Sequence, residues 1–247
     1  METSMKDYLQ DIVAHTHSLG FIDLVKITGT DQETNLEAVA GDRSVIVMAK
    51  FKGIVPDFIG TFGMPNLNKL NTILNIPEYK ENPHITVVKQ NRDGEDVPVG
   101  VHFENANRDF INDYRFMSAE IVNDKLKTIK FKGVTWDVEL VPSVASIQRL
   151  RFQASANSEE TTFIAKVENG DLKFYFGDHS THAGNFVFQS GVNGNLTKAW
   201  SWPINAAIGI LSLPGDKTFK ISDQGAAMIT VDSGIVDYNY ILPAQQK

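Results

Sequence analysis

Four segments with helical spacing recur along this chain in two pairs, and one fixed offset separates the pairs. Pro65 stands before the second segment and Pro203 before the fourth, and these prolines are 138 positions apart. Leu9 in the first segment and Ile147 in the third are also 138 positions apart. Strand-like sequence follows each helix, so each half is ordered helix, strands, helix, strands. This repeat predicts two similar α+β domains in tandem.

Each helical segment is defined by apolar residues three and four positions apart, which form one stripe of an amphipathic helix. The stripes are Leu9, Ile12 and Val13; Leu67, Leu70, Ile73 and Leu74; Val144, Ile147 and Leu150; and Ile204, Ala207, Ile208 and Leu211. Between the helices, alternating apolar residues predict antiparallel strands, and Asn169-Gly170 predicts a tight hairpin turn. The predicted fold class is therefore α+β with antiparallel sheets.

A run of lysines lies between the two halves. Its members are Lys125, Lys127, Lys130 and Lys132. A solvated linker or an edge strand explains such a run, because lysine also deters strand aggregation. We expect an N-terminal domain over residues 1–120, a connector over 121–138 and a C-terminal domain over 139–247.

Composition narrows the class of protein. The 247 residues include no cysteine, which excludes disulfides, thiolate metal ligands and cysteine nucleophiles. The N-terminus lacks a basic stretch followed by an apolar run, and no segment approaches the ~18 consecutive apolar residues of a membrane span. These features predict a soluble intracellular protein that has no membrane partner.

The formal net charge of −7 is distributed unevenly. Residues 1–120 carry 11 basic and 18 acidic residues, whereas residues 121–247 carry 12 of each. Phosphate binding depends on lysine and arginine, so an acidic protein does not wrap nucleic acid with its whole surface. Any contact with nucleic acid is expected at local basic patches.

One short motif indicates an enzyme. Asp232-Ser233-Gly234 follows an apolar run, as in aspartic proteases, which need two such aspartates facing each other. The position 138 residues earlier is Gly94, where no second copy of the motif exists, so a protease would have to be a homodimer using Asp232. A β-turn between two terminal strands explains the motif at least as well.

No other pattern predicts a catalytic residue, a metal or a cofactor. His15 and His17 point to different sides of a helix, and His179 and His182 lie in a polar loop without an evident third ligand. The glycine-rich nucleotide-binding patterns and the Gly-x-Ser-x-Gly of serine hydrolases are absent from the sequence. We therefore expect a binding protein and not an enzyme.

Five segments that span nearly the whole chain occur in a characteristic order. They are Lys6-Asp7 in the first helix, Met64 to Leu74 through the second, Ser143 to Gln153 with Leu150-Arg151 in the third, the Asn169-Gly170 hairpin, and Tyr238 to Ala244 near the end. Their order and spacing resemble the DNA sliding clamps of T4-like phages, which are processivity factors for DNA polymerase. The resemblance implies a viral protein that acts in the cytoplasm of an infected bacterial host.

The resemblance also implies an assembly. A sliding clamp of this family is a homotrimeric ring of six similar domains, with two helices of each domain on the inner wall and antiparallel sheets outside. Double-stranded DNA passes through the ring without being read for sequence. The implied partners are the DNA polymerase and an ATP-dependent clamp loader, and the clamp itself needs no cofactor.

Helical projection names the side chains that would face the DNA, if the face opposite each apolar stripe is the inner one. The predicted DNA-binding residues are Lys6 and His15 on the first helix, Asn68 and Lys69 on the second, and Arg149 and Arg151 on the third. An ordinary solvated helix surface explains each of them about as well.

Clamps of this family bind partner peptides in a groove between the connector and the C-terminal strand. The apolar residues that the resemblance assigns to this groove are Val134, Trp136, Ile241, Leu242 and Pro243. Their apolar character permits an extended peptide to dock. A normal edge strand with a frayed tail stays an alternative, and a phage structural protein with repeated β-rich domains stays an alternative function.

Overall fold

The computed structural model describes residues 3–92, 94–127, 131–178, 180 and 182–245. The chain forms two compact units, and each unit draws on separate parts of the sequence. Unit 1 consists of Met1–Gly41, Val47–Lys130 and Ser233–Tyr238, and unit 2 consists of Asp42–Ile46, Phe131–Asp232 and Asn239–Lys247. The last part of the chain therefore contributes to both units.

The main sheet of unit 1 has the strand order β8-β4-β1-β2-β3. Its strands are β1 (Leu24–Gly29), β2 (Thr34–Val39), β3 (Ile46–Phe51), β4 (Gly60–Pro65) and β8 (Met117–Ser118). β1 pairs antiparallel with β4, so Val25 and Ile27 share one face of the sheet with Met64 and Phe62. All four side chains are fully buried, and they form one wall of the core.

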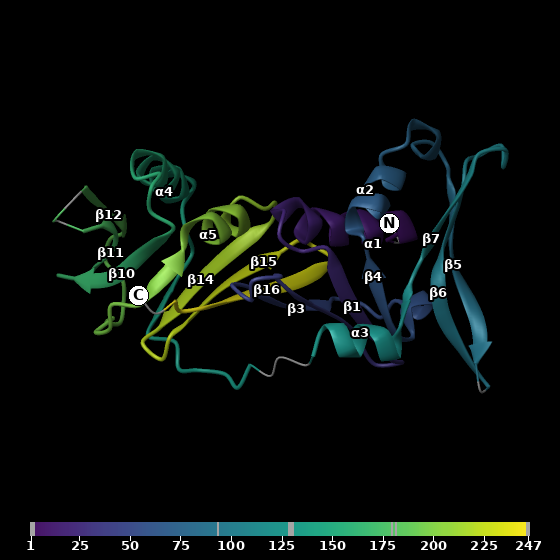
Figure 1. Cartoon of the computed structure of the whole chain (residues 1–247), viewed down its shortest axis with the longest axis horizontal. Helices are drawn as coiled ribbons and strands as arrows, with labels where there is room; N and C mark the ends of the chain where they lie inside the picture. The colour runs from purple at the N-terminus through teal and green to yellow at the C-terminus, as the bar shows by residue number, and fades with distance from the viewer. Residues whose placement is uncertain (1–2, 93, 128–130, 179, 181, 246–247) are drawn as a thin grey trace. The chain divides into compact units, whose positions relative to one another are not determined.

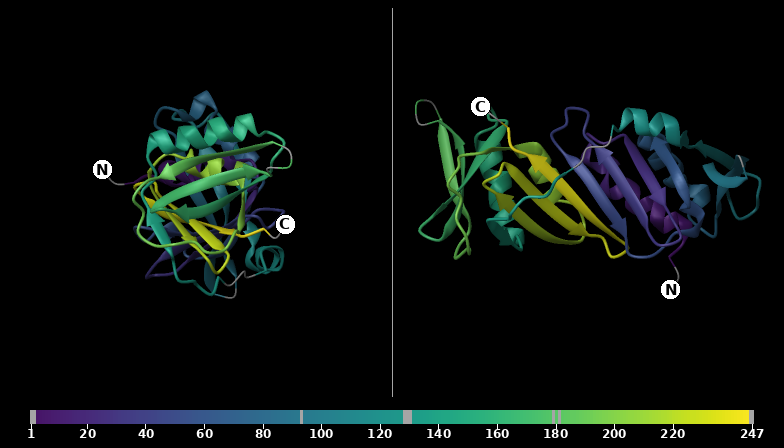
Figure 2. Two further views of the ribbon diagram at one scale, coloured as in Figure 1. Left: turned by 90° about the vertical axis from the view of Figure 1, so that its left-hand side faces the viewer. Right: turned by 90° about the horizontal axis from the view of Figure 1, so that it is seen from below.

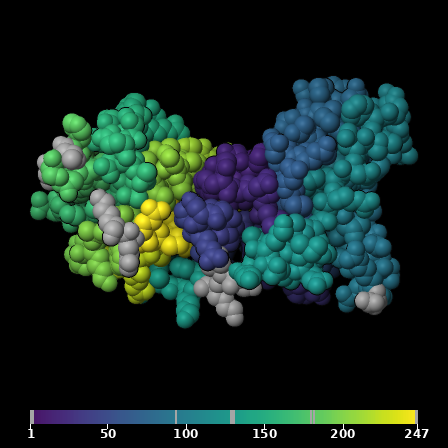
Figure 3. Space-filling view, in the orientation of Figure 1, coloured from purple at the N-terminus to yellow at the C-terminus, as the bar shows by residue number. Residues whose placement is uncertain are grey.

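Two helices, α1 (Met5–His15) and α2 (Leu67–Leu74), lie side by side on this unit (Figure 1; Figure 3). α1 begins with a capping box, in which the Ser4 side chain and the Asp7 side chain each bond the other residue's backbone N–H. The Asn66 side chain caps α2 by accepting the N–H of Lys69. Short 3-10 helices follow at His17–Leu19 (η1), Pro56–Phe58 (η2) and Pro77–Tyr79 (η3).

A third helix, α3 (Ala119–Lys125), lies on the other side of the sheet from α1 (Figure 1; Figure 2). Gly63 alternates with Phe62 and Met64 along β4, so it faces α3. A Cβ atom at this glycine would lie only 2.8 Å from the Val122 side chain. The close approach of α3 therefore depends on a residue without a side chain.

A second sheet of unit 1 consists of β5 (His84–Arg92), β6 (Glu95–Glu104) and β7 (Ile111–Arg115). β6 is the central strand and pairs antiparallel with both neighbours. Val101, Phe103 and Tyr114 are buried on one face, while most of β5 is exposed. β5 and β7 are the two edges of this sheet.

Unit 2 also contains two sheets and two helices. Four strands follow one another in the order β16 (Val236–Pro243), β15 (Ala226–Asp232), β14 (Asp216–Ser222) and β9 (Val138–Leu140), and β16 belongs to unit 2 from Asn239 onward. The other sheet has the order β12 (Ala183–Gln189), β11 (Asp171–Gly177), β10 (Thr162–Glu168) and β13 (Ser201–Pro203). The helices are α4 (Val144–Ala156) and α5 (Ile204–Leu211).

Aromatic side chains fill the core of unit 2. Phe174 lies within stacking or edge contact of Phe163, Phe186, Phe188 and Phe219, at ring-centroid distances of 4.4–6.3 Å. The Phe174-Tyr175-Phe176 run thus serves core packing through its first and third members, which alternate inward along β11.

The four predicted helices are confirmed as α1, α2, α4 and α5, and the Asn169-Gly170 hairpin is confirmed between β10 and β11. Asn169 and Gly170 both have positive φ, as a tight two-residue turn requires. Pro65 ends β4, and Asn66 caps the helix that the sequence placed directly after the proline. No apolar periodicity predicted α3, because only Val122 of its seven residues is buried. Lys130 and His179 lie outside the described residues.

Candidate nucleic-acid interface and partner groove

Lys6, a predicted DNA-binding residue, lies in the first turn of α1 and is half-buried. Its Nζ donates to the backbone oxygen of Tyr79 at 2.6 Å and lies 3.4 Å from that of Lys80. Both carbonyls belong to the end of η3, whose backbone needs such donors. The Lys6 ammonium group is therefore hydrogen-bonded to the backbone of unit 1.

His15, the second predicted residue of α1, is only 3% exposed. Its ring stacks on Tyr238, with 4.7 Å between ring centroids and 10° between ring planes. Helical projection put His15 at the edge of a solvent-facing surface, but the Ser233–Tyr238 segment covers that edge in unit 1. Because a buried ring has no surface to offer DNA, the structure corrects the expectation that His15 contacts DNA.

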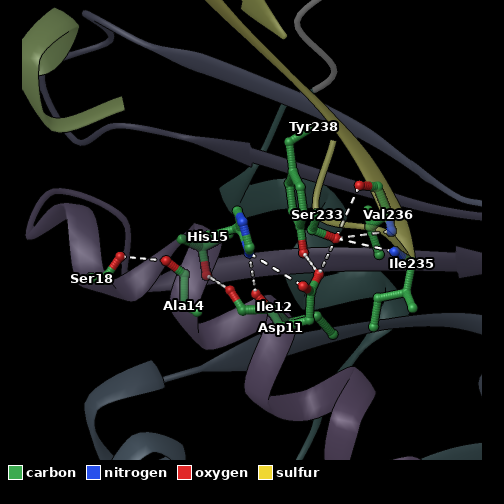
Figure 4. Close-up of polar contacts among 10 residues, drawn as sticks. Asp11, Ile12, Ala14, His15, Ser18, Ser233, Ile235, Val236 and Tyr238 are labelled. Carbon is green, nitrogen blue, oxygen red and sulfur yellow. Dashed lines mark hydrogen bonds and ion pairs between the residues drawn. The ribbon is translucent and has the colours of Figure 1, made fainter. Parts of the chain in front are cut away.

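Asp11 anchors this segment to α1 (Figure 4). Its Oδ2 accepts hydrogen bonds from the Tyr238 hydroxyl at 2.8 Å and from the Ser233 hydroxyl at 3.1 Å. The Ser233 oxygen in turn accepts the N–H of Val236 at 3.0 Å. We call Asp11, His15, Ser233 and Tyr238 the α1 latch. Polar side chains of α1 thus bind the Ser233–Tyr238 segment.

The remaining predicted residues of unit 1, Asn68 and Lys69, are exposed on α2. Beside them a groove of about 240 Å³ lies between α1 and α2. Its polar lining consists of Gln10, His17, Ser18, Asn71 and Asn75 and includes no lysine, arginine or carboxylate side chain. The exposed surface of α1 and α2 therefore carries several side-chain amides near the ammonium group of Lys69.

In unit 2 the predicted residues Arg149 and Arg151 are both exposed on α4. Arg149 donates from Nη1 to the Val187 oxygen at 3.0 Å, and its guanidinium lies 5.3 Å from the centroid of the Phe186 ring. Arg151 donates to the Ser212 hydroxyl. Neither arginine forms an ion pair within the described part of the chain, so both present uncompensated charge at the surface.

The five residues predicted to line the partner groove differ in exposure. Val134, Trp136 and Pro243 are half-buried, whereas Ile241 and Leu242 are 2% and 1% exposed. The last two side chains therefore belong to the core of unit 2. Because buried side chains offer no free apolar surface, the structure corrects the expectation that Ile241 and Leu242 line a groove.

Polar contacts fasten the connector to unit 2. The Ser222 hydroxyl donates to the Thr135 oxygen at 2.6 Å, and the backbone N–H of Asp223 donates to Asp137 Oδ2 at 2.7 Å. The Trp200 indole N–H donates to the Asp223 oxygen at 2.8 Å. The sequence predicts neither connector contact, since Ser222 with Thr135 and Asp223 with Asp137 are each more than 80 positions apart and leave no local pattern.

The Asp223 carboxylate holds a further loop. Burial disfavours its charged form, but hydrogen bonds from the Thr197 side chain and from the backbone of Thr197 and Lys198 hold its pKa below the usual value. The carboxylate is therefore ionised at neutral pH and keeps this loop in place beside the connector.

Asp232, the candidate protease residue, ends β15 and lies across the sheet from Asp216 on β14. The next residue, Ser233, starts the turn into β16 and is held by the α1 latch and by Val236. Gly234 has a φ of 98°, a conformation that glycine adopts without strain. The Asp-Ser-Gly motif thus forms a β-turn with structural hydrogen bonds.

No helix within the described ranges is long and apolar enough to cross a membrane. Over the same ranges no three His, Asp or Glu side chains are grouped so as to hold a metal ion.

Comparisons with known proteins identify the fold but no sequence relative. No protein-family model matches the sequence, and no curated protein matches it. Among solved structures, the PCNA of A. fulgidus with the C-terminal region of FEN-1 bound matches with a TM-score of 0.68 and 10% identity, covering 98% of this chain and 95% of that one. The PCNA of Thermococcus kodakaraensis has a TM-score of 0.66 at 10% identity, with 98% of both chains covered.

A third match is the PCNA2–PCNA3 complex of Sulfolobus tokodaii, with a TM-score of 0.67, 9% identity and 96% of both chains covered. The likeness includes both halves of the chain in each of the three structures. The predicted clamp-type α+β fold is confirmed, and the chain has the fold of the PCNA-type sliding clamps over nearly its whole length.

Proposed function

We propose that this protein is a DNA sliding clamp, a ring that encircles double-stranded DNA and tethers a polymerase for processive synthesis. The observation that carries the proposal is the near-complete coverage of the chain by the clamp fold, at 96–98% in three comparisons. A clamp works by topology and positioning, so the proposal assigns no catalytic residue to this chain.

The DNA-facing surface would be formed by the exposed sides of the helix pairs. In this proposal Arg149 and Arg151 of unit 2, with Lys69 and Asn68 of unit 1, contact the phosphate backbone. Such contacts carry no sequence information and exchange quickly, which suits a protein that slides. The acidic remainder of the surface, with a net charge of −7 for the chain, would disfavour DNA binding elsewhere.

A homotrimer would form by head-to-tail pairing of sheet edges. β7 is an edge strand in unit 1, and exposed apolar side chains, Phe110 (40%) and Ile111 (52%), lie at its start. β12 is an edge strand in unit 2, and it packs beside α4, where Val144 (85%) and Phe152 (63%) are exposed. Unpaired edges beside exposed apolar groups favour strand pairing. Pairing of β7 with β12 of the next copy is heterologous, and three such contacts would close a ring.

Partner peptides would dock on unit 2 beside the connector. The half-buried Val134, Trp136 and Pro243 offer apolar surface there, and the Asp223 contacts hold the connector in position. The polymerase and an ATP-dependent clamp loader are the proposed partners. The phage origin and the location in an infected bacterium rest on the sequence resemblance alone.

The proposal is tested by the size, shape and DNA retention of the assembly. We expect sedimentation to give a particle of three times 27.4 kDa, and negative-stain microscopy to show rings with a hole wide enough for a duplex. Rings loaded onto plasmid DNA should stay on nicked circles and leave after linearisation, because free ends let a ring slide off. Monomers at high concentration, or equal retention on circular and linear DNA, would contradict the proposal.

A further inference from the structure

A groove on unit 1 lies between the β5–β6 hairpin and the segment that leads from β7 into α3. Its volume is about 390 Å³, within the usual range for ligand and peptide sites. The polar side chains that line it are Gln90 and Arg92 on β5, Arg115 on β7, Ser118 on β8 and Glu120 on α3. We call it the arginine groove. None of these residues lines the α1–α2 groove.

The strand register puts the two arginines on one face of the sheet. Val88, Gly100 and Arg115 lie side by side across β5, β6 and β7. Val88 and Arg92 are four positions apart on β5, so they point to the same face, and the irregular register after Val88 is accommodated by β6. Both guanidinium groups therefore border the same space.

Several side-chain hydrogen-bond donors of this groove have no acceptor among the described residues. Among the described residues, the Arg115 side chain has no hydrogen bond or ion pair, and the Arg92 side chain donates only to Gln90 Oε1, at 3.3 Å. Ser118 is the N-cap residue of α3, yet its hydroxyl makes no capping bond. Glu120 supplies the one carboxylate of the lining. Five donors on each guanidinium suit a ligand that brings carboxylate or phosphate oxygens.

The rest of the lining decides which kind of ligand fits. Val97, Val99 and Phe116 give the groove an apolar part, which a peptide side chain can cover. Glu95 and Asp96 lie in the same hairpin, beside Arg92, and would repel the continuous charge of a nucleic-acid backbone. A peptide places single carboxylates against single arginines and keeps the rest of its chain uncharged.

We propose that the arginine groove binds an acidic segment of a partner protein, with carboxylate side chains on Arg92 and Arg115 and an apolar side chain against Phe116. This site is separate from the partner site proposed on unit 2 beside the connector, so one subunit would hold two protein segments at once. The proposal does not depend on DNA encirclement, because the groove lies within unit 1.

The test selects binders from a random heptapeptide library on the immobilised full-length protein. We expect wild type to enrich peptides with two or more Asp or Glu residues, and the best synthetic peptide to lose about tenfold in affinity when its acids become Asn and Gln. Arg92→Ala and Arg115→Ala should each weaken that peptide about tenfold. Arg108→Ala is the matched control, because this exposed arginine of unit 1 lies outside the groove and should leave binding unchanged.

Four outcomes would overturn the proposal. They are a library without acidic binders, peptide binding that persists in both arginine variants, equal losses in the Arg108 control, and Arg92-dependent binding of a labelled single-stranded oligonucleotide in place of peptide. Sedimentation of each variant gives a further contradicting outcome: loss of the trimer in Arg115→Ala alone would assign Arg115 to the contact between copies and not to a peptide site. Retention on circular DNA is measured with the wild-type protein, so failure of the groove proposal and failure of the clamp function are distinguishable.

Discussion

Helices α1 and α4 open the two halves of the repeat, yet they use their polar faces in opposite ways. Each begins at a serine whose side chain caps the helix, Ser4 or Ser143. Asp11 of α1 and Arg149 of α4 are 138 positions apart, the offset that also separates Leu9 from Ile147, whereas the two capping serines are 139 positions apart. Asp11 lies in the latch and holds Ser233 and Tyr238, whereas Arg149 is exposed.

This difference shows that equivalent helices in a duplicated fold need not share a function. α1 buries Leu9, Ile12, Val13 and His15, because unit 1 includes a segment from the end of the chain that covers its flank. α4 buries only Ser146 and Leu150 and leaves Phe152 exposed. Buried contacts are therefore concentrated on α1, and exposed side chains are concentrated on α4.

The largest expected effect is on the latch. Asp11→Ala removes the acceptor of two side-chain hydrogen bonds and leaves two donors poorly satisfied, so we expect a loss of about 3 kcal/mol in the free energy of unfolding. Arg149→Ala, the change at the equivalent position, should cost about 1 kcal/mol or less. Urea unfolding measures both variants, and equal losses would remove the contrast between the helices.

The next effect concerns self-association through α4. Phe152 and Ala14 are 138 positions apart, so Phe152→Ala gives α4 the residue that α1 carries. We expect the variant trimer to dissociate at a protein concentration roughly tenfold to a hundredfold higher than the wild-type trimer does, as for loss of an aromatic interface residue. Ala14→Ser on α1 is the control and should leave assembly unchanged. Sedimentation across a dilution series gives the result, and an unshifted transition for Phe152→Ala would place the interface elsewhere.

A smaller effect is expected on DNA contact. The double variant Arg149→Ala, Arg151→Ala should lower the steepness of log affinity against log salt by about two. Each lost arginine–phosphate contact means that about one counterion fewer leaves the DNA on binding. Lys6→Ala should leave that slope unchanged, since Lys6 is bound to the Tyr79 oxygen. Fluorescence anisotropy of labelled duplex at several salt concentrations makes the comparison. A lower slope for Lys6→Ala would indicate that Lys6 of α1 does contact DNA.

The smallest effect is a pH dependence confined to unit 1. Asp113 and Glu104 carboxylates lie 2.7 Å and 3.2 Å from the two ring nitrogens of His102, and they raise its pKa. A raised folded-state pKa stabilises below the unfolded value of about 6.5, and the stabilisation is lost as pH rises through the folded value. In the comparable pair of unit 2, hydrogen bonds from the side chains of Tyr175 and Lys173 hold the pKa of Glu168 below its usual value, so this carboxylate is already ionised near neutrality.

His102→Gln should therefore flatten a small decrease in stability as the pH rises above about 6.5, whereas Lys173→Gln should not. Denaturant midpoints at several pH values measure this, and the NMR titration of His102 gives the pKa directly. A His102 pKa at or below that of an unfolded peptide would contradict the assignment.

The candidate site was only partly predictable from the sequence. Lys69, Arg149 and Arg151 are exposed as the helical projections require, because a polar residue opposite an apolar stripe faces away from the helix's own sheet. His15 occupies a similar position on its helix, but a segment more than 200 residues later covers it. The family resemblance assigned Ile241 and Leu242 to a partner groove, yet β16 carries both side chains into the core of unit 2.

The sequence by itself determined the four helices, the hairpin at Asn169-Gly170 and the tandem α+β class. These features depend on residues a few positions apart, where apolar spacing, capping residues and turn residues act directly on the backbone. Only the tertiary structure decided that Asp11 would be an anchor and Arg149 a surface cation, although the repeat makes them equivalent. The reason is physical: the accessibility of a polar face depends on which distant segment packs against it, and hydrogen bonds such as that from Tyr238 to Asp11 leave no periodic trace in the sequence.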